Sequence, residues 1–108
     1  SASKQLTETL FSGSGKSFRK VVLVRYPHPG LWTIAFLTGD GMAEANRKTG
    51  RNLVNIFVPT TPNPTSGFFL MVPREDMIEL DMPVDVGIKL ILSAGAVSPE
   101  GRPEPAGD

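Results

Sequence analysis

Short apolar segments separated by turn residues dominate the pattern of this chain. They are rich in valine, isoleucine and aromatic residues and are bounded by Gly, Pro, Asn or Asp, which is typical of β-strands. The segments 53–58 and 67–72 are apolar at both alternating positions, which predicts central strands or a sheet covered on both faces. The predicted strands lie at 18–26, 31–38, 53–58, 67–72 and, as a short last strand, 77–80.

Three further segments bear on the helices. Apolar residues recur every four positions in residues 1–11, which predicts a short helix that frays because it is too short to be stable alone. The polar segment 42–51 is compatible with a mobile loop or one helical turn. Residues 83–93 begin with a proline and are almost entirely apolar, which predicts a helix buried against the sheet.

These elements together predict an α+β fold: a small four- or five-stranded sheet with a frayed N-terminal helix and one buried C-terminal helix. The length of 108 residues fits one domain, which we place at residues 1–97. Residues 98–108 contain prolines and charges but almost no apolar side chain, so we expect a disordered tail there.

Composition excludes several kinds of site. The chain has no cysteine, which excludes disulfides, thiolate chemistry and cysteine-ligated metals. His28 is the only histidine, so no histidine pair can hold a metal ion. Residues 13–17 (GSGKS) are similar to a phosphate-binding loop, but that motif requires a glycine where Leu10 stands. We therefore expect no metal, no cofactor and no nucleotide.

Charge is balanced overall but unevenly placed. The formal net charge is zero, so we expect no general attraction to nucleic acid. Acidic residues gather at 75–85, and we interpret them as solvated or helix-capping because their spacing does not fit a calcium-binding loop. Basic residues gather near the start, where they form either a solvated face or a face against an anionic membrane surface. The membrane-proximal candidates are Lys4, Lys16, Arg19 and Lys20.

A stiff, hydroxyl-rich loop at 60–66, which we call the proline loop, joins the two strands predicted to be central. Pro62 and Pro64 restrict its backbone, and Gly67 is expected to supply either a positive φ or a close backbone approach. The loop is a rigid corner, or it binds a small anion, a lipid headgroup or a peptide end. The candidate ligand-binding residues are Thr60, Thr61, Asn63, Thr65, Ser66, Gly67 and Arg74.

Three separated motifs carry a resemblance to a known family. They are 20–24 (KVVLV), 32–39 (WTIAFLTG) and 57–76 (FVPTTPNPTSGFFLMVPRED). In this order they resemble the membrane-protein family called domain of unknown function 502, whose plant relatives are the LIKE COV and continuous vascular ring proteins. The resemblance covers residues 1–97. It implies that two hydrophobic helices precede this region, and it implies no established biochemical activity.

The resemblance and the charge pattern lead to one main interpretation of function. We expect a non-catalytic, cytosolic domain of a two-span bacterial inner-membrane protein that acts in interaction or assembly. The basic start favours the cytoplasmic side by the positive-inside rule. The expected partners are the membrane surface, through the preceding spans, and a second copy or another protein. The alternative is a module that binds a small anionic ligand or lipid headgroup at the proline loop.

Overall fold

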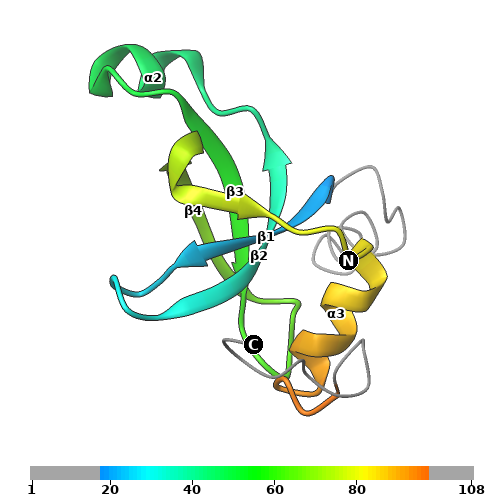
Figure 1. Cartoon of the computed structure of the whole chain (residues 1–108). Helices are drawn as coiled ribbons and strands as arrows, with labels where there is room; N and C mark the ends of the chain where they lie inside the picture. Colours follow the sequence, from blue (N-terminus) through cyan, green and yellow to red (C-terminus); the bar gives the residue numbers. More distant parts are fainter. Residues whose placement is uncertain (1–17, 98–108) are drawn as a thin grey trace.

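Five antiparallel strands form one sheet in the computed structural model, which describes residues 18–97 (Figure 1). The strand order is β4-β3-β2-β1-β5, so the first four strands form a meander and β5 returns to the outer edge of β1. A single 3₁₀ turn, η1 (Arg74–Asp76), makes that return possible. The strands are β1 (Lys20–Arg25), β2 (Trp32–Gly39), β3 (Leu53–Pro59), β4 (Gly67–Pro73) and β5 (Met77–Glu79). The expected α+β class is confirmed.

The segment between β2 and β3 contains a helix that the sequence pattern underestimated. We predicted a loop or one helical turn, and the structure has α2 (Ala43–Thr49), which is longer. The helix ends at Gly50, whose left-handed φ of 70° suits glycine and whose amide donates to the Asn46 carbonyl oxygen. The Asn46 side-chain oxygen accepts a hydrogen bond of 3.1 Å from the Leu53 amide, which ties α2 to the start of β3.

The concave face of the sheet holds one apolar cluster. Side chains alternate along each strand, so every second residue of β1, β2 and β3 points to this face. Met77 on β5 adds to it, and Leu70 and Val72 on β4 pack at its margin. The buried members are Val22, Val24, Ala35, Leu37, Val54, Ile56, Val58 and Met77.

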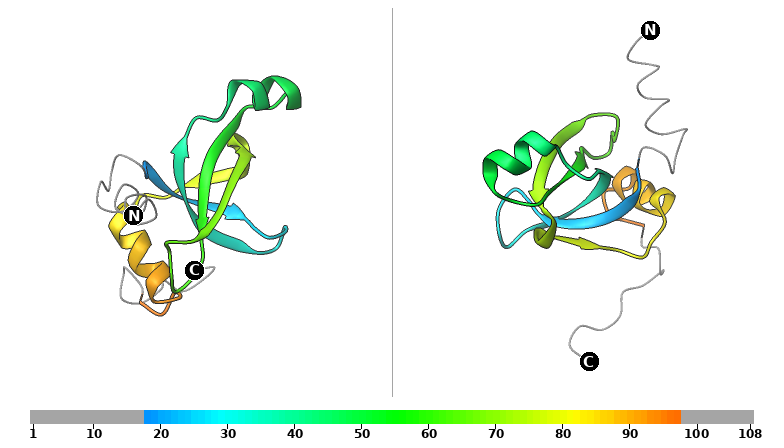
Figure 2. Two further views of the ribbon diagram at one scale, coloured as in Figure 1. Left: turned by 180° about the vertical axis from the view of Figure 1, so that it is seen from behind. Right: turned by 90° about the horizontal axis from the view of Figure 1, so that it is seen from above.

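The opposite face is partly covered by the helix α3 (Val84–Leu92) and by Phe18. The Phe18 ring stacks on Phe36, with centroids 4.7 Å apart, and on Phe57 at 5.8 Å. Figure 2 shows α3 lying to one side of the sheet, away from α2. Our expectation of a buried helix was only partly correct, because among its residues only Gly87 and Ile91 are buried. The helix covers the sheet with one side and presents the other to solvent.

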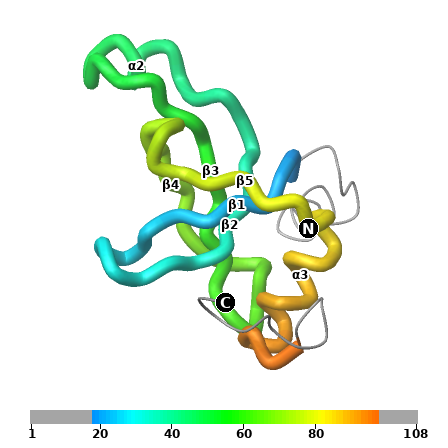
Figure 3. Tube along the Cα trace, in the orientation of Figure 1, coloured from blue at the N-terminus to red at the C-terminus, as the bar shows by residue number. Residues whose placement is uncertain are grey.

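The position of β4 corrects another expectation. We predicted that 67–72 is a central or doubly covered strand, but β4 pairs only with β3 and forms one edge of the sheet. The Cα trace in Figure 3 shows β4 outside β3, with β5 crossing beside β1. The apolar side chains of β4 are largely exposed as a result.

Two expectations concern segments outside the described residues: the N-terminal helix at 1–11 and the disordered tail at 98–108. Within residues 18–97, no helix has the length and apolar character needed to cross a membrane.

Candidate functional site

The proline loop is organised by its own side chains. The Thr60 amide donates to the Ser66 carbonyl oxygen at 2.8 Å, which continues the β3–β4 pairing into the loop. The Thr60 hydroxyl lies 2.5 Å from the Asn63 carbonyl oxygen and 2.8 Å from the Ser66 hydroxyl. The Asn63 side-chain oxygen accepts from the amide and the hydroxyl of Thr65, at 3.1 and 2.5 Å. These hydroxyls therefore close the loop on itself.

The loop also contacts the end of α3. The Thr61 hydroxyl donates to the carbonyl oxygen of Ile91, and Pro64 is buried. Each of the four hydroxyls that we singled out thus has a partner within the protein, which supports the structural interpretation of this loop. The alternative, ligand binding by the same groups, stays a prediction.

Gly67 is required by close approach rather than by a positive φ. A Cβ atom at this position would lie 2.2 Å from the Val58 carbonyl oxygen and 2.8 Å from the Pro59 Cα. Both are backbone atoms of the neighbouring strand and cannot rotate away. Only glycine therefore allows β4 to begin against the end of β3.

Arg74 does not join the other candidate ligand-binding residues. It follows β4, whereas the proline loop precedes it, and seven residues at about 3.4 Å each separate them by roughly 24 Å. One guanidinium nitrogen of Arg74 lies 3.7 Å from a carboxylate oxygen of Asp40 instead. The structure brings together only residues 60–67 of the predicted set, because these are contiguous in the chain.

The predicted basic surface is only partly visible. Lys4 and Lys16 lie outside the described residues. Arg19 forms an ion pair with Asp40 at 3.1 Å, and this pair is exposed enough to contribute little to stability. Lys20 is half-buried on β1, opposite Leu37 of β2.

The acidic segment contains one ion pair. Arg51 contacts the carboxylate of Glu75 at 3.3 Å. The pKa of Glu75 lies below its ordinary value of 4.5, chiefly because the Glu75 backbone amide donates a hydrogen bond to the carboxylate. The hydrogen bond from Arg51 lowers this pKa further. In the part of the chain that the structure describes, no three acidic or histidine side chains are grouped to hold a metal ion.

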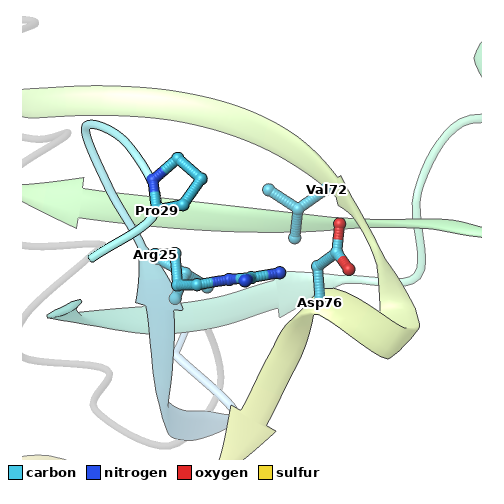
Figure 4. A pocket seen from close by; sticks show the side chains of 5 residues that line it. Arg25, Pro29, Val72 and Asp76 are labelled. Atoms are coloured by element: carbon cyan, nitrogen blue, oxygen red, sulfur yellow. The ribbon is translucent and has the colours of Figure 1, made fainter. Parts of the chain in front are cut away.

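A small cleft opens beside the free end of the β1–β2 hairpin. It has a volume of about 180 Å³ and is lined by Val24, Arg25, Pro29, Val72 and Asp76. Figure 4 shows the Arg25 guanidinium directed across the cleft toward the Asp76 carboxylate. The Arg25 guanidinium also lies 5.9 Å from the Trp32 ring centroid, a cation–π distance. Because Arg25 and Asp76 carry opposite charges, the lining of the cleft has no excess of either charge with which to bind an ion.

A second, more apolar groove lies between α3, the start of β2 and the proline loop. Its volume is about 310 Å³, and Trp32, Ile34, Leu90 and Ile91 form much of its wall. Its polar side chains are those of Thr33 and Thr61, and the Thr61 hydroxyl already donates to the carbonyl oxygen of Ile91. The groove can take an apolar side chain but presents no pair of groups suited to acid–base chemistry.

The edge strand β4 carries three exposed apolar side chains close together, a feature that our sequence interpretation missed. The exposed fractions are 54% for Phe68, 61% for Phe69 and 38% for Met71. β4 contains no charged residue. We call Phe68, Phe69 and Met71, with the free backbone edge of β4, the β4 edge surface. The sequence signal for such a surface was an apolar strand without any charge, but a buried central strand has the same pattern.

Comparison with known proteins gives the family of this chain. Residues 1–66 match the model of the family described as "Protein of unknown function (DUF502)". The chain belongs to this family. It is 30% identical to the Protein LIKE COV 3 of Arabidopsis thaliana over 100 residues, and 28% identical to the CONTINUOUS VASCULAR RING 1 protein of the same plant. These alignments cover 92% of this chain but only 36% and 37% of the relatives. No solved structure matches significantly.

The DUF502 match can be placed on the fold. It includes β1, β2, α2, β3 and the proline loop, and it stops at Ser66, directly before β4. The alignments with the plant relatives extend over 100 residues and therefore continue beyond this point. The family is defined without a known activity, so a function for this member has to be argued from its surfaces.

Proposed function

We propose that this DUF502 domain is a non-catalytic interaction module that works beside a membrane, on the cytoplasmic face of a bacterial inner membrane. The observation that carries the proposal is the β4 edge surface. It combines exposed aromatic side chains, the absence of charge and an edge that no other strand of residues 18–97 pairs with.

Such an edge is unusual for a domain that stays alone. Natural sheets protect their edges with charged side chains, proline, bulges or a covering segment, because a free apolar edge recruits other strands. The residues of β4 provide none of these devices between Gly67 and Val72. Exposed apolar patches of this kind mark surfaces that bind other proteins. We therefore assign the β4 edge surface to contact with a partner.

The membrane setting rests on the family resemblance and on chain length. The resemblance implies that two hydrophobic helices precede this region, and this chain spans little more than a third of its plant relatives. The basic residues Arg19 and Lys20 lie at the start of β1, close in sequence to where such helices would end. By the positive-inside rule, this placement favours the cytoplasm.

The β4 edge surface can be tested in the full-length protein in its own cells. A photo-crosslinking phenylalanine analogue in place of Phe69 is expected to give a defined adduct of higher mass on illumination. The matched control places the analogue at Ile78, which is 49% exposed on the other edge strand. Adducts from position 69 and not from 78 support the proposal. Equal adducts, or none, would show that the β4 edge surface is not the interaction site.

The membrane side has its own test, made simple by the absence of cysteine in this chain. Lys48→Cys places a single thiol on the exposed surface of α2. In right-side-out spheroplasts of cells that make the otherwise cysteine-free full-length protein, a membrane-impermeant maleimide should label this thiol only after lysis. Labelling before lysis would place the domain on the outer side.

A further inference from the structure

The direction of the backbone groups of β4 follows from the two hydrogen bonds that flank the strand. The Thr60 amide donates to the Ser66 carbonyl oxygen, and the Arg74 amide donates to the Asn52 carbonyl oxygen. In an antiparallel pair, alternate residues exchange both of their hydrogen bonds with the neighbouring strand. These two flanking bonds belong to the same register as the pair of Ile56 and Leu70. Counting every second residue from Ser66 to Arg74 therefore shows that Phe68, Leu70 and Val72 form backbone hydrogen bonds with β3.

The intervening residues of β4 direct their backbone groups away from the protein. Gly67, Phe69 and Met71 each point an N–H and a C=O outward, and Pro73 points a C=O but has no N–H. Within residues 18–97, the only strand that pairs with β4 is β3, on the other side. The outward groups form a regular row that only another extended strand can match completely.

We propose that β4 pairs antiparallel with β4 of a second copy of this chain, across a two-fold axis at Leu70. Phe69 then lies opposite Met71 of the second copy, and Met71 opposite Phe69. Gly67 lies opposite Pro73, which has only a carbonyl to offer. This register forms about six hydrogen bonds and overlaps all seven residues of the strand. It names the partner for the β4 edge surface and so rests on the function proposed above.

A row of apolar side chains across the sheet supports this arrangement. Val21, Phe36, Phe57 and Phe69 are successive neighbours in the register, from β1 to β4. Val21 and Phe36 are buried, Phe57 is half-buried and Phe69 is the most exposed. The row thus ends at the edge with its last aromatic ring uncovered. In the dimer, Met71 of the second copy continues it, and methionine sulfur packs favourably against aromatic rings.

Charge and symmetry favour β4 over the other edge as the partner strand. An uncharged strand can face its own copy without repulsion. β5 has only three residues and ends at Glu79, so it offers a short and charged edge. Pairing β4 with β5 would also be head-to-tail and would form a ring or a filament of several copies, whereas β4 with β4 closes after two copies.

The expected dimer is weak in solution. One strand from each copy makes a contact that is small beside the roughly 1,200–2,000 Å² of standard interfaces. Attachment to a membrane would raise the local concentration of the two copies and favour the pairing without new contacts. Solution measurements should therefore extend to about 1 mM, the concentration range of weak specific binding.

The first test uses proline to remove an outward hydrogen bond. Met71→Pro deletes an N–H that points away from β3, which an edge strand tolerates. Analytical ultracentrifugation of the natural chain should show mass rising from 11.6 kDa toward twice that value with concentration. Met71→Pro should stay folded, with an unchanged circular dichroism spectrum, and remain monomeric. The matched variant Leu70→Pro deletes an N–H that bonds to β3 and should unfold the edge.

The second test uses the expected axis. Leu70 of each copy would face the other as a pair without mutual hydrogen bonds, whose Cα atoms lie about 4.5 Å apart, within reach of a disulfide. Leu70→Cys should therefore form a covalent dimer under mild oxidation. Glu79→Cys, on the other edge strand, is the control and should stay monomeric.

The outcomes separate this inference from the function on which it rests. A dimer that Met71→Pro abolishes, together with the Leu70→Cys disulfide, supports pairing of two copies. A monomer up to about 1 mM, with photo-adducts from position 69 to a different protein, overturns the second copy but keeps the interaction module. A dimer that Met71→Pro leaves intact overturns the pairing through β4.

Discussion

At the scale of single residues, two glycines, Gly67 and Gly87, show that close contacts between elements are of different kinds. A Cβ on Gly67 would meet backbone atoms of β3, whereas a Cβ on Gly87 of α3 would meet a methyl group of Val21 at 2.9 Å. A backbone obstacle forces the strand to move, and a side-chain obstacle can be relieved by a small shift. The two positions therefore differ in how much a methyl group should cost.

We predict that Gly67→Ala lowers the free energy of unfolding by about 3 kcal/mol, because the strand pairing must distort to avoid the Val58 carbonyl. Gly87→Ala should cost about 1–2 kcal/mol, since a crowded Val21 is partly offset by the better helix propensity of alanine. Urea unfolding curves of both variants measure these values. A smaller loss for Gly67→Ala than for Gly87→Ala would contradict the close approach.

At the scale of elements, the predictions succeeded where the local pattern decides and failed where distant pairing decides. All five strands and α3 were placed near their observed bounds, because β-branched and aromatic segments bounded by Gly and Pro form strands in most settings. The prediction that β4 is a central strand was wrong, because β5 pairs with β1 rather than with β4 and so leaves β4 at the edge of the sheet. The apolar content of a strand shows that its side chains favour burial. It does not show whether the same chain or a partner buries them.

The helix α2 and the candidate site illustrate the same limit. α2 lacks an apolar stripe, and its order depends on Gly50 and on the contact of Asn46 with Leu53. Residues 60–67 lie together because they are contiguous in the chain, but their pattern did not indicate that β4 carries Arg74 away from them. The link from Thr61 to Ile91, thirty residues later, was equally invisible.

The proline loop is the element that connects β3, β4 and α3, so we predict that its hydroxyls stabilise the fold. Thr61→Ala should cost about 1 kcal/mol by leaving the Ile91 carbonyl without this donor. Thr60→Ala should cost a similar amount, whereas Thr65→Ala should cost less, because the Thr65 hydroxyl contacts only Asn63 within the exposed loop. Thermal unfolding of the three variants gives the comparison. Variants of unchanged stability that lose function in the full-length protein would favour ligand binding instead.

At the scale of the whole molecule, the sheet is covered unequally. Its concave face is filled by the cluster around Val54 and Ile56, and α3 with Phe18 covers the other face over β1, β2 and β3. Within residues 18–97, this cover packs on β1, β2 and β3, whereas Phe69 and Met71 on the same face of β4 stay exposed. This uneven cover leaves Phe69 and Met71 exposed at one edge of the sheet, where a partner strand would bury them.

Hydrogen exchange of the backbone amides tests this description of the whole molecule without any substitution. In dilute solution, the amides of Phe68, Leu70 and Val72 should exchange slowly, because they bond to β3 within a folded sheet. The amides of Phe69 and Met71 should exchange fast, since they point outward. Raising the concentration should slow these two amides selectively if β4 pairs with a second copy, because pairing hides them from water. Slow exchange of Phe69 and Met71 already in dilute solution would mean that another part of the chain covers the edge, and the β4 edge surface would then not be free to bind.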